Sequence, residues 1–200
     1  EAECKTLETL LHRGRVNGVP GLRILSGAEA RAMEPNLSEN VQAALHAPSA
    51  GIVNPWEFAL AMAETAVENG VQLCLQSPVT DICKTEGGFR VQTPHSAYEA
   101  KYVFNAAGVQ ADEVHALLED PGYAITPSRG EYYLMDKSQG TQVGRVIFQC
   151  PNQNGKGVLV APTVHGNLIV GPNAEPMPDR RNLGTTGAGL AYVREKALRS

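Results

Sequence analysis

The stretch NPWEFALAMAETAVENGVQLCL, residues 54–75, decides the fold class of this chain. Asn54 can cap a helix, Glu57 can reach back to that cap, and the proline between them suits the first helical turn. Gly70 is the residue type that most often follows a helix C-terminus, so we expect the helix to end there. The apolar residues 71–75 then predict a strand. The stretch therefore indicates a helix-to-strand unit of mixed α/β type.

Upstream of this unit, leucines at helical spacing predict a helix over residues 1–13, and a capping box of Ser26 and Glu29 predicts a second, short helix. Downstream, alternating apolar residues predict a three-stranded antiparallel meander. Its strands are expected at residues 79–83, 89–93 and 97–103.

The last strand of the meander continues into a run of small residues, and a helix is expected to follow it as far as Leu118. The run is Asn105, Ala106, Ala107 and Gly108. Small residues after a buried strand let a helix or a ligand approach the backbone closely. After residue 121 the pattern predicts antiparallel strands, and Thr185 or Thr186 caps a final helix. The whole chain is therefore expected to be α+β, with a mixed α/β part followed by an antiparallel sheet.

Composition excludes several classes of protein. The 200 residues include 17 Lys and Arg against 21 Asp and Glu, a formal net charge of −4, which argues against a nucleic-acid-binding surface. No apolar run approaches the roughly 18 residues that a membrane span needs. No His or Cys spacing typical of a metal site is present, so we expect no metal. The four cysteines form no close pair, which predicts reduced thiols in a cytoplasmic protein.

The usual glycine-rich turn that binds a dinucleotide pyrophosphate is absent. Two short glycine motifs, Gly155-Lys156-Gly157 and Gly187-Ala188-Gly189, both lack the third small residue at the required spacing.

Four segments carry a resemblance to a known family: PSAGIVNP (48–55), NAAG (105–108), SRGEYY (128–133) and residues 157–173. They resemble the FAD-dependent oxidoreductases of the D-amino-acid oxidase superfamily. The branch they resemble contains bacterial proteins called glycerol-3-phosphate dehydrogenases, with L-2-hydroxyglutarate oxidases nearby.

In that family the dinucleotide fingerprint lies in an N-terminal strand-turn-helix, and a further FAD contact lies near the C-terminus. The resemblance therefore implies that this chain is an interior fragment whose partners are the missing N- and C-terminal parts of the same protein. The expected divisions are a partial FAD-binding lobe (1–76 and 99–120), the antiparallel meander (77–98), the strands of a substrate lobe (121–176), and a loop with the start of a helix (177–200).

The resemblance also implies cofactor-binding residues. Val79 matches the residue whose backbone meets the adenine of FAD, and the segment 105–108 matches a strand end near the cofactor phosphates. Asn173 follows a strand that arrives near the flavin. Each has a structural alternative: a plain strand residue at Val79, and tight strand-to-helix packing at 105–108.

Arg129 and Tyr132 are the expected substrate-side residues. Alternation along the strand places Arg129, Glu131 and Tyr133 on one face and Tyr132 on the other. Arginine suits a carboxylate or phosphate because its planar fork donates two hydrogen bonds, and the resemblance places this strand over the flavin. The alternative is an arginine in a surface ion pair. The better-known glycerol-3-phosphate enzymes more often have Lys-Gly-x-His here, and SRGEYY is more similar to the hydroxy-acid branch.

His165 has two interpretations. An unperturbed histidine titrates near neutrality and can serve as a general base. This histidine precedes Gly166 in an expected hairpin turn, however, and a polar turn residue needs no catalytic role, so the turn is favoured.

Taken together, the resemblance implies a fragment of an FAD-dependent dehydrogenase or oxidase. The whole enzyme would oxidise the CH–OH group of a small anionic substrate, glycerol 3-phosphate or a 2-hydroxy acid, by hydride transfer to the flavin. The fragment alone is expected to be inactive and not to hold FAD tightly. Two alternatives stay open: a non-catalytic binding module of the same fold, and an oxidase acting on the CH–NH group of an amine or amino acid.

Overall fold

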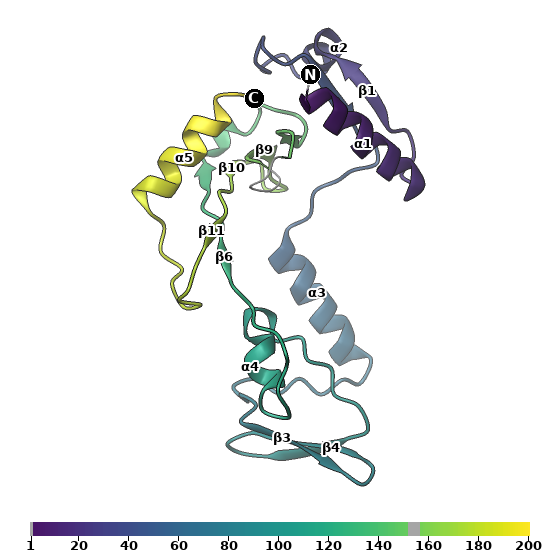
Figure 1. Ribbon diagram of the computed structural model, residues 1–200, viewed down its shortest axis with the longest axis vertical. Coiled ribbons are helices and arrows are strands. Elements are labelled where there is room, and N and C mark those ends of the chain that lie inside the picture. Colours follow the sequence, from purple (N-terminus) through teal and green to yellow (C-terminus); the bar gives the residue numbers. More distant parts are fainter. Residues whose placement is uncertain (1, 152–156) are drawn as a thin grey trace. The chain divides into compact units, whose positions relative to one another are not determined.

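The computed structural model describes residues 2–151 and 157–200 and has a mixed α/β architecture with antiparallel sheets (Figure 1). Gly155 and Lys156, from one of the glycine motifs, lie outside the described residues. The chain forms two compact units. Unit 1 comprises Glu1–Phe58, Arg129–Glu175 and Leu183–Ser200, and unit 2 comprises Ala59–Ser128 and Pro176–Asn182.

Unit 1 begins with two helices and a two-stranded antiparallel sheet. The elements are α1 (Ala2–Val16), β1 (Arg23–Ser26), α2 (Gly27–Met33) and β2 (Ala43–His46). The expected capping box is confirmed: the Glu29 N–H donates to Ser26 Oγ at 3.3 Å, and the Ser26 N–H donates to the Glu29 carboxylate at 2.8 Å. The strand β2 was not expected from the sequence, because its four residues are all half-buried and show no alternation.

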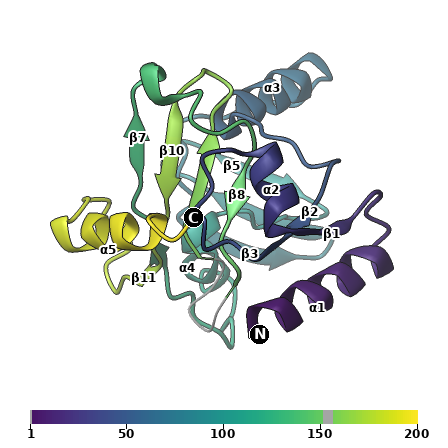
Figure 2. The same cartoon turned by 90° about the horizontal axis from the view of Figure 1, so that it is seen from above.

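The second part of unit 1 is a four-stranded antiparallel sheet in the order β7-β10-β9-β8. Its strands are β7 (Tyr133–Met135), β8 (Ile147–Phe148), β9 (Leu159–Pro162) and β10 (Leu168–Gly171). The helix α5 (Gly187–Ala197) packs against β10 (Figure 2). Thr186 caps this helix by accepting the Gly189 N–H at 3.1 Å, as its sequence predicts. The short elements η2 (Lys137–Gln139), β6 (Ser128–Arg129) and β11 (Glu175–Pro176) complete this region, and β6 pairs with β11.

Unit 2 contains most of α3 (Pro55–Glu68) and the three-stranded sheet in the order β3-β4-β5. The sheet confirms the expected meander, with strands β3 (Asp81–Thr85), β4 (Gly88–Gln92) and β5 (Ala97–Ala100). Asn54 caps α3 as predicted, because its Oδ1 accepts the N–H groups of Trp56 at 3.0 Å and Glu57 at 3.3 Å. A short turn η1 (Gly108–Gln110) leads into α4 (Ala111–His115), which is shorter than the helix expected up to Leu118.

Two expected strands were wrong. Residues 71–75 are not a strand in the structure, and the last meander strand ends at Ala100 instead of continuing through residues 104–108, although both segments are apolar. A strand is defined by hydrogen bonds to a neighbour, and the sheets formed by the described residues do not include either segment. Their side chains are exposed instead, at 57% for Leu73 and 91% for Phe104.

None of the helices in the described part of the chain is both long enough and apolar enough to span a lipid bilayer.

Candidate functional site

The two faces of the four-stranded sheet in unit 1 have different neighbours. Directly paired residues of neighbouring strands point to the same face, and the register pairs Tyr133 with Val170 and Leu134 with Ile169. The Tyr133 hydroxyl donates to the Leu190 carbonyl of α5 at 3.2 Å. The face that carries Tyr133 is therefore covered by α5, and Leu134 lies on the opposite face.

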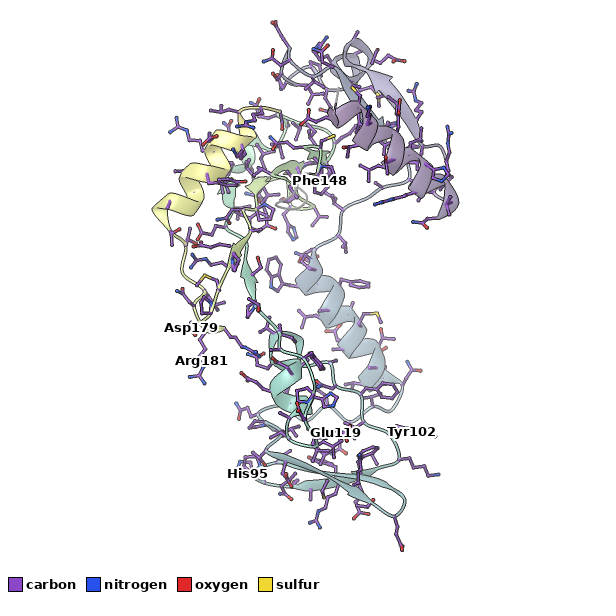
Figure 3. The ribbon with its side chains drawn as sticks, in the orientation of Figure 1. His95, Tyr102, Glu119, Phe148, Asp179 and Arg181 are labelled. Carbon is purple, nitrogen blue, oxygen red and sulfur yellow. The ribbon has the colours of Figure 1, made fainter. Side chains whose placement is uncertain are left out.

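We call this opposite face, with the side chains of Tyr132, Leu134 and Phe148, the open face. Phe148 belongs to it because it pairs with Leu159, which also pairs with Gly171, two residues beyond Ile169. The three side chains are 43%, 68% and 55% exposed, respectively (Figure 3 labels Phe148). An exposed apolar sheet face of this kind is typical of a ligand-binding or interaction surface.

Tyr132 contributes the hydroxyl of the open face. An added Cβ at Gly171 would lie 2.7 Å from the Tyr132 ring, so the tyrosine packs directly on the glycine backbone. Gly171 also has φ of +143°, which other residues rarely adopt. Partial burial raises the pKa of the Tyr132 phenol above its ordinary value. At neutral pH this hydroxyl is therefore protonated and can donate a hydrogen bond.

Arg129, expected as the receptor for an anionic group, contacts groups of the protein itself. Its Nη1 donates to the Gly184 carbonyl at 2.7 Å, and its Nη2 lies 2.8 Å from a Glu175 oxygen and 3.0 Å from a Glu131 oxygen. The Arg129 side chain is only 11% exposed. Its role as an anion receptor stays a prediction, and it requires at least one of these contacts to be exchanged for the ligand.

The structure places the Asn173 side chain beside the backbone of the segment that carries Arg129 and Tyr132. Asn173 Oδ1 accepts the backbone N–H of Glu131 at 2.7 Å, one residue before Tyr132. Sequence reasoning missed Glu131 as a functional candidate. Alternation did place it beside Arg129, but its burial and its contact with Thr186 depend on residues far along the chain.

The expected cofactor-binding residues fall in both units: Val79 and the segment 105–108 lie in unit 2, whereas Asn173 lies in unit 1 with Arg129 and Tyr132. Val79 is 37% exposed. The side chain of Asn105 bonds locally, accepting the Ala107 N–H at 3.2 Å and donating to the Ala111 carbonyl at 2.7 Å. Gly108 has φ of +59° and open space where a Cβ would project. The segment 105–108 thus forms a small-residue turn whose backbone a ligand can approach.

His165 occupies the turn between β9 and β10, in line with the favoured interpretation. Its Nε2 lies 3.0 Å from a Glu57 carboxylate oxygen and 3.0 Å from Asn54 Nδ2, at the start of α3. The side chains of His165 and Glu57 are both more than half exposed. Glu57 therefore contacts this histidine, an interaction not expected from the sequence.

Comparison with known proteins identifies the family. The family model described as FAD dependent oxidoreductase matches residues 1–200. The chain is 50% identical over 198 residues to a glycerol 3-phosphate dehydrogenase of Caloramator mitchellensis, covering 99% of this chain and 41% of that protein. It is 29% identical to an L-2-hydroxyglutarate dehydrogenase of Escherichia coli, covering 87% of this chain and 42% of that protein.

Among solved structures, the dithionite-reduced L-α-glycerophosphate oxidase of Mycoplasma pneumoniae with FAD bound is similar at a TM-score of 0.88 and 27% identity. That match covers 99% of this chain and 53% of the oxidase. The chain thus spans about half the length of the proteins it matches. Because the family model matches the chain throughout, this chain belongs to the FAD-dependent oxidoreductase family.

Proposed function

We propose that the whole protein is an FAD-dependent dehydrogenase or oxidase that oxidises the CH–OH group of a small anionic substrate, with glycerol 3-phosphate as the first candidate. The observation that carries the proposal is the 50% identity, over 99% of this chain, to a glycerol 3-phosphate dehydrogenase. The lower identity to an L-2-hydroxyglutarate dehydrogenase makes a 2-hydroxy acid the second candidate.

The open face is the proposed substrate side. FAD, when bound, supplies the acceptor for the hydride of the C–H bond, while the hydroxyl loses its proton and a carbonyl forms. The chain's own contribution is to orient the substrate, and the Tyr132 phenol can do this by donating a hydrogen bond to the substrate oxygen. The apolar side chains of Leu134 and Phe148 exclude water beside it.

The residues in unit 2 fit part of an FAD site. The turn at 105–108 leaves room for a ligand because Gly108 has open space at its Cβ position and the two residues before it are alanines. Val79 is 37% exposed, in a segment that precedes β3. A Gly-x-Gly-x-x-Gly turn is not among these 200 residues. We therefore propose that these positions support the cofactor and that its pyrophosphate is held elsewhere in the whole protein.

We propose that the rest of the same polypeptide packs on an apolar surface of unit 2. This surface is formed by α3 from Ala59 onward and by the segments 71–75 and 102–104; α3 has no buried residue, and Leu60 is 64% exposed. Figure 3 labels Tyr102 of this surface, which is 78% exposed. Large exposed apolar patches normally mark an interface. The matched proteins are about twice as long as this chain, which supports the proposal. We also propose a cytoplasmic location, which the four free cysteines support.

Anaerobic reduction of the whole protein tests the function. The purified protein is mixed in a stopped-flow instrument with glycerol 3-phosphate, L-2-hydroxyglutarate or an amino acid, and bleaching of the flavin absorbance is followed. We expect glycerol 3-phosphate to bleach the flavin of the wild-type protein fast and the flavin of the Tyr132→Phe variant more slowly. Bleaching by amino acids alone would show a CH–NH oxidase, and a protein that retains FAD but reacts with no substrate would support a non-catalytic module.

A further inference from the structure

Glu131 carries a buried carboxylate next to Tyr132 in the chain, on the α5 side. It is 3% exposed, the lowest value among the buried polar residues that the structure describes, and its side chain is 1% exposed. A carboxylate taken out of water must be compensated by a counter-charge and by hydrogen bonds. The groups that compensate Glu131 therefore indicate why it is there.

Glu131 joins the strand of Tyr132 to the beginning of α5. Thr186 Oγ1 donates to the carboxylate and lies 3.0 and 3.2 Å from its two oxygens, while the same hydroxyl accepts the Gly189 N–H at 3.1 Å. The carboxylate thus lies at the positive end of an eleven-residue helix, where a negative charge is favourable. On the other side, Asn173 holds the backbone of Glu131.

Gly189 makes room for this carboxylate. An added Cβ at Gly189 would lie 1.8 Å from a Glu131 oxygen and 2.8 Å from Asn173 Nδ2. The motif Gly187-Ala188-Gly189 does not match the dinucleotide fingerprint. Its last glycine is instead explained by the close contact with Glu131. It lets α5 approach the protein's own carboxylate.

Arg129 is the counter-charge. Its terminal nitrogens contact the Gly184 carbonyl and two carboxylates, Glu131 and the half-exposed Glu175. One guanidinium between two carboxylates leaves a local charge of −1, which repels an incoming anion. Alternation also places Arg129 and Glu131 on the α5 side of the strand, whereas Tyr132 faces the open side.

We propose that Glu131 is a positioning residue and that Arg129 is its fixed counter-ion instead of the receptor for the substrate's anionic group. Together with Thr186 they fix the segment 130–132, which leads into β7, to the beginning of α5. The inference rests on the proposed function only for its kinetic readout, because the stability readout needs no substrate.

The test compares Arg129→Met, Glu131→Gln and the double variant in the whole protein, by thermal unfolding and by steady-state kinetics. Each single variant is expected to lower Tm by several degrees, because it leaves a buried group without its partner. The double variant should unfold at a higher temperature than Arg129→Met. A strand shifted by a fraction of an ångström should lower kcat about tenfold or more, while KM for the anionic substrate changes less than about threefold.

Arg145→Met is the matched control. Arg145 pairs with Glu34 at 2.9 Å in unit 1, but its side chain is 50% exposed. We expect a smaller change in Tm and no loss of kcat. The proposal is overturned if Arg129→Met keeps the wild-type Tm and raises KM a hundredfold or so without recovery in the double variant, since that pattern defines an anion receptor. If no substrate is oxidised at all, the proposed function fails, and the recovery of Tm in the double variant still decides whether the pair acts as a unit.

Discussion

Unit 1 contains eight of the nine buried apolar residues in the described part of the chain, whereas unit 2 contains one. Val158 and Val193 of unit 1 are less than 2% exposed, and Ile82 is the one buried apolar residue among the described part of unit 2. The helix α3 is as apolar as a core helix and yet buries no residue. The difference teaches that apolar residues in a sequence predict burial, but only a partner surface provides it.

Polar contacts partly replace the missing core of unit 2. Arg180 forms a two-pronged ion pair with Asp112 and also donates to the Ile125 carbonyl at 3.1 Å. The Arg180 guanidinium and the Ile125 N–H, which donates to Asp112 at 2.8 Å, hold the pKa of the Asp112 carboxyl far below its usual range. The Arg129–Glu131 pair of unit 1 is likewise an ion pair with little exposure, but unit 1 also has buried apolar residues.

Core truncation gives the largest expected difference between the units. We expect Val193→Ala to lower the free energy of unfolding by roughly 2 kcal/mol, because it leaves a cavity where the buried side chain of α5 packs. Leu60→Ala in α3, where Leu60 is 64% exposed, should have almost no effect in this chain. Urea unfolding followed by circular dichroism measures both. Equal losses in this chain would contradict the contrast drawn between the units.

Acid should destabilise unit 2 through Asp112. A carboxyl whose folded pKa is lowered contributes stability above its unfolded pKa of about 4, and that contribution is lost as the pH falls toward the folded pKa. Wild-type chain should therefore be more stable than Asp112→Asn at pH 7, and the gap in urea midpoint should narrow below about pH 4. A gap that does not change with pH would exclude this ion pair as the source.

The exposed apolar surface of unit 2 should bind a hydrophobic dye. We expect Phe104→Ser to reduce the fluorescence of 8-anilinonaphthalene-1-sulfonate bound to this chain, because Phe104 is 91% exposed among other apolar residues. Leu183→Ser is the matched control, since Leu183 is 88% exposed on a loop of unit 1. In the whole protein the Phe104 effect should disappear. Persistence there would show that the surface is not covered.

The smallest effect is expected for an exposed ion pair of unit 2. Lys84 and Glu119 lie 2.8 Å apart, but both side chains are more than half exposed (Figure 3 labels Glu119). Such pairs contribute little because water and salt screen them. Lys84→Gln should leave the urea midpoint within experimental error, and a clear loss would mean that unit 2 depends on its surface charges.

Sequence reasoning succeeded where the determining contacts are local. The caps at Ser26, Asn54 and Thr186 each bond to an N–H within three residues, so the residue types nearby were sufficient. It failed at residues 71–75, where a strand requires a neighbour that the chain does not supply in the described structure.

The candidate site shows the same limit. Glu131 and Tyr132 have different neighbours, as alternation predicts: Glu131 contacts Thr186, and Tyr132 packs on Gly171. The expected single strand was wrong, because residues 130–132 lie between β6 and β7 and belong to neither. The partners of Arg129 were not predictable: Glu175 and Gly184 lie 46 and 55 residues further along the chain.

The sequence by itself determined the helix caps, the meander, the strand alternation and the family resemblance, because each depends on residue types at short spacing. Only the tertiary structure decided that Arg129 is surrounded by internal partners and that Tyr132 faces the open side of its sheet. It also decided that the apolar residues of α3 are exposed. Burial and ion pairing depend on which distant segments meet, and short-range spacing does not encode that.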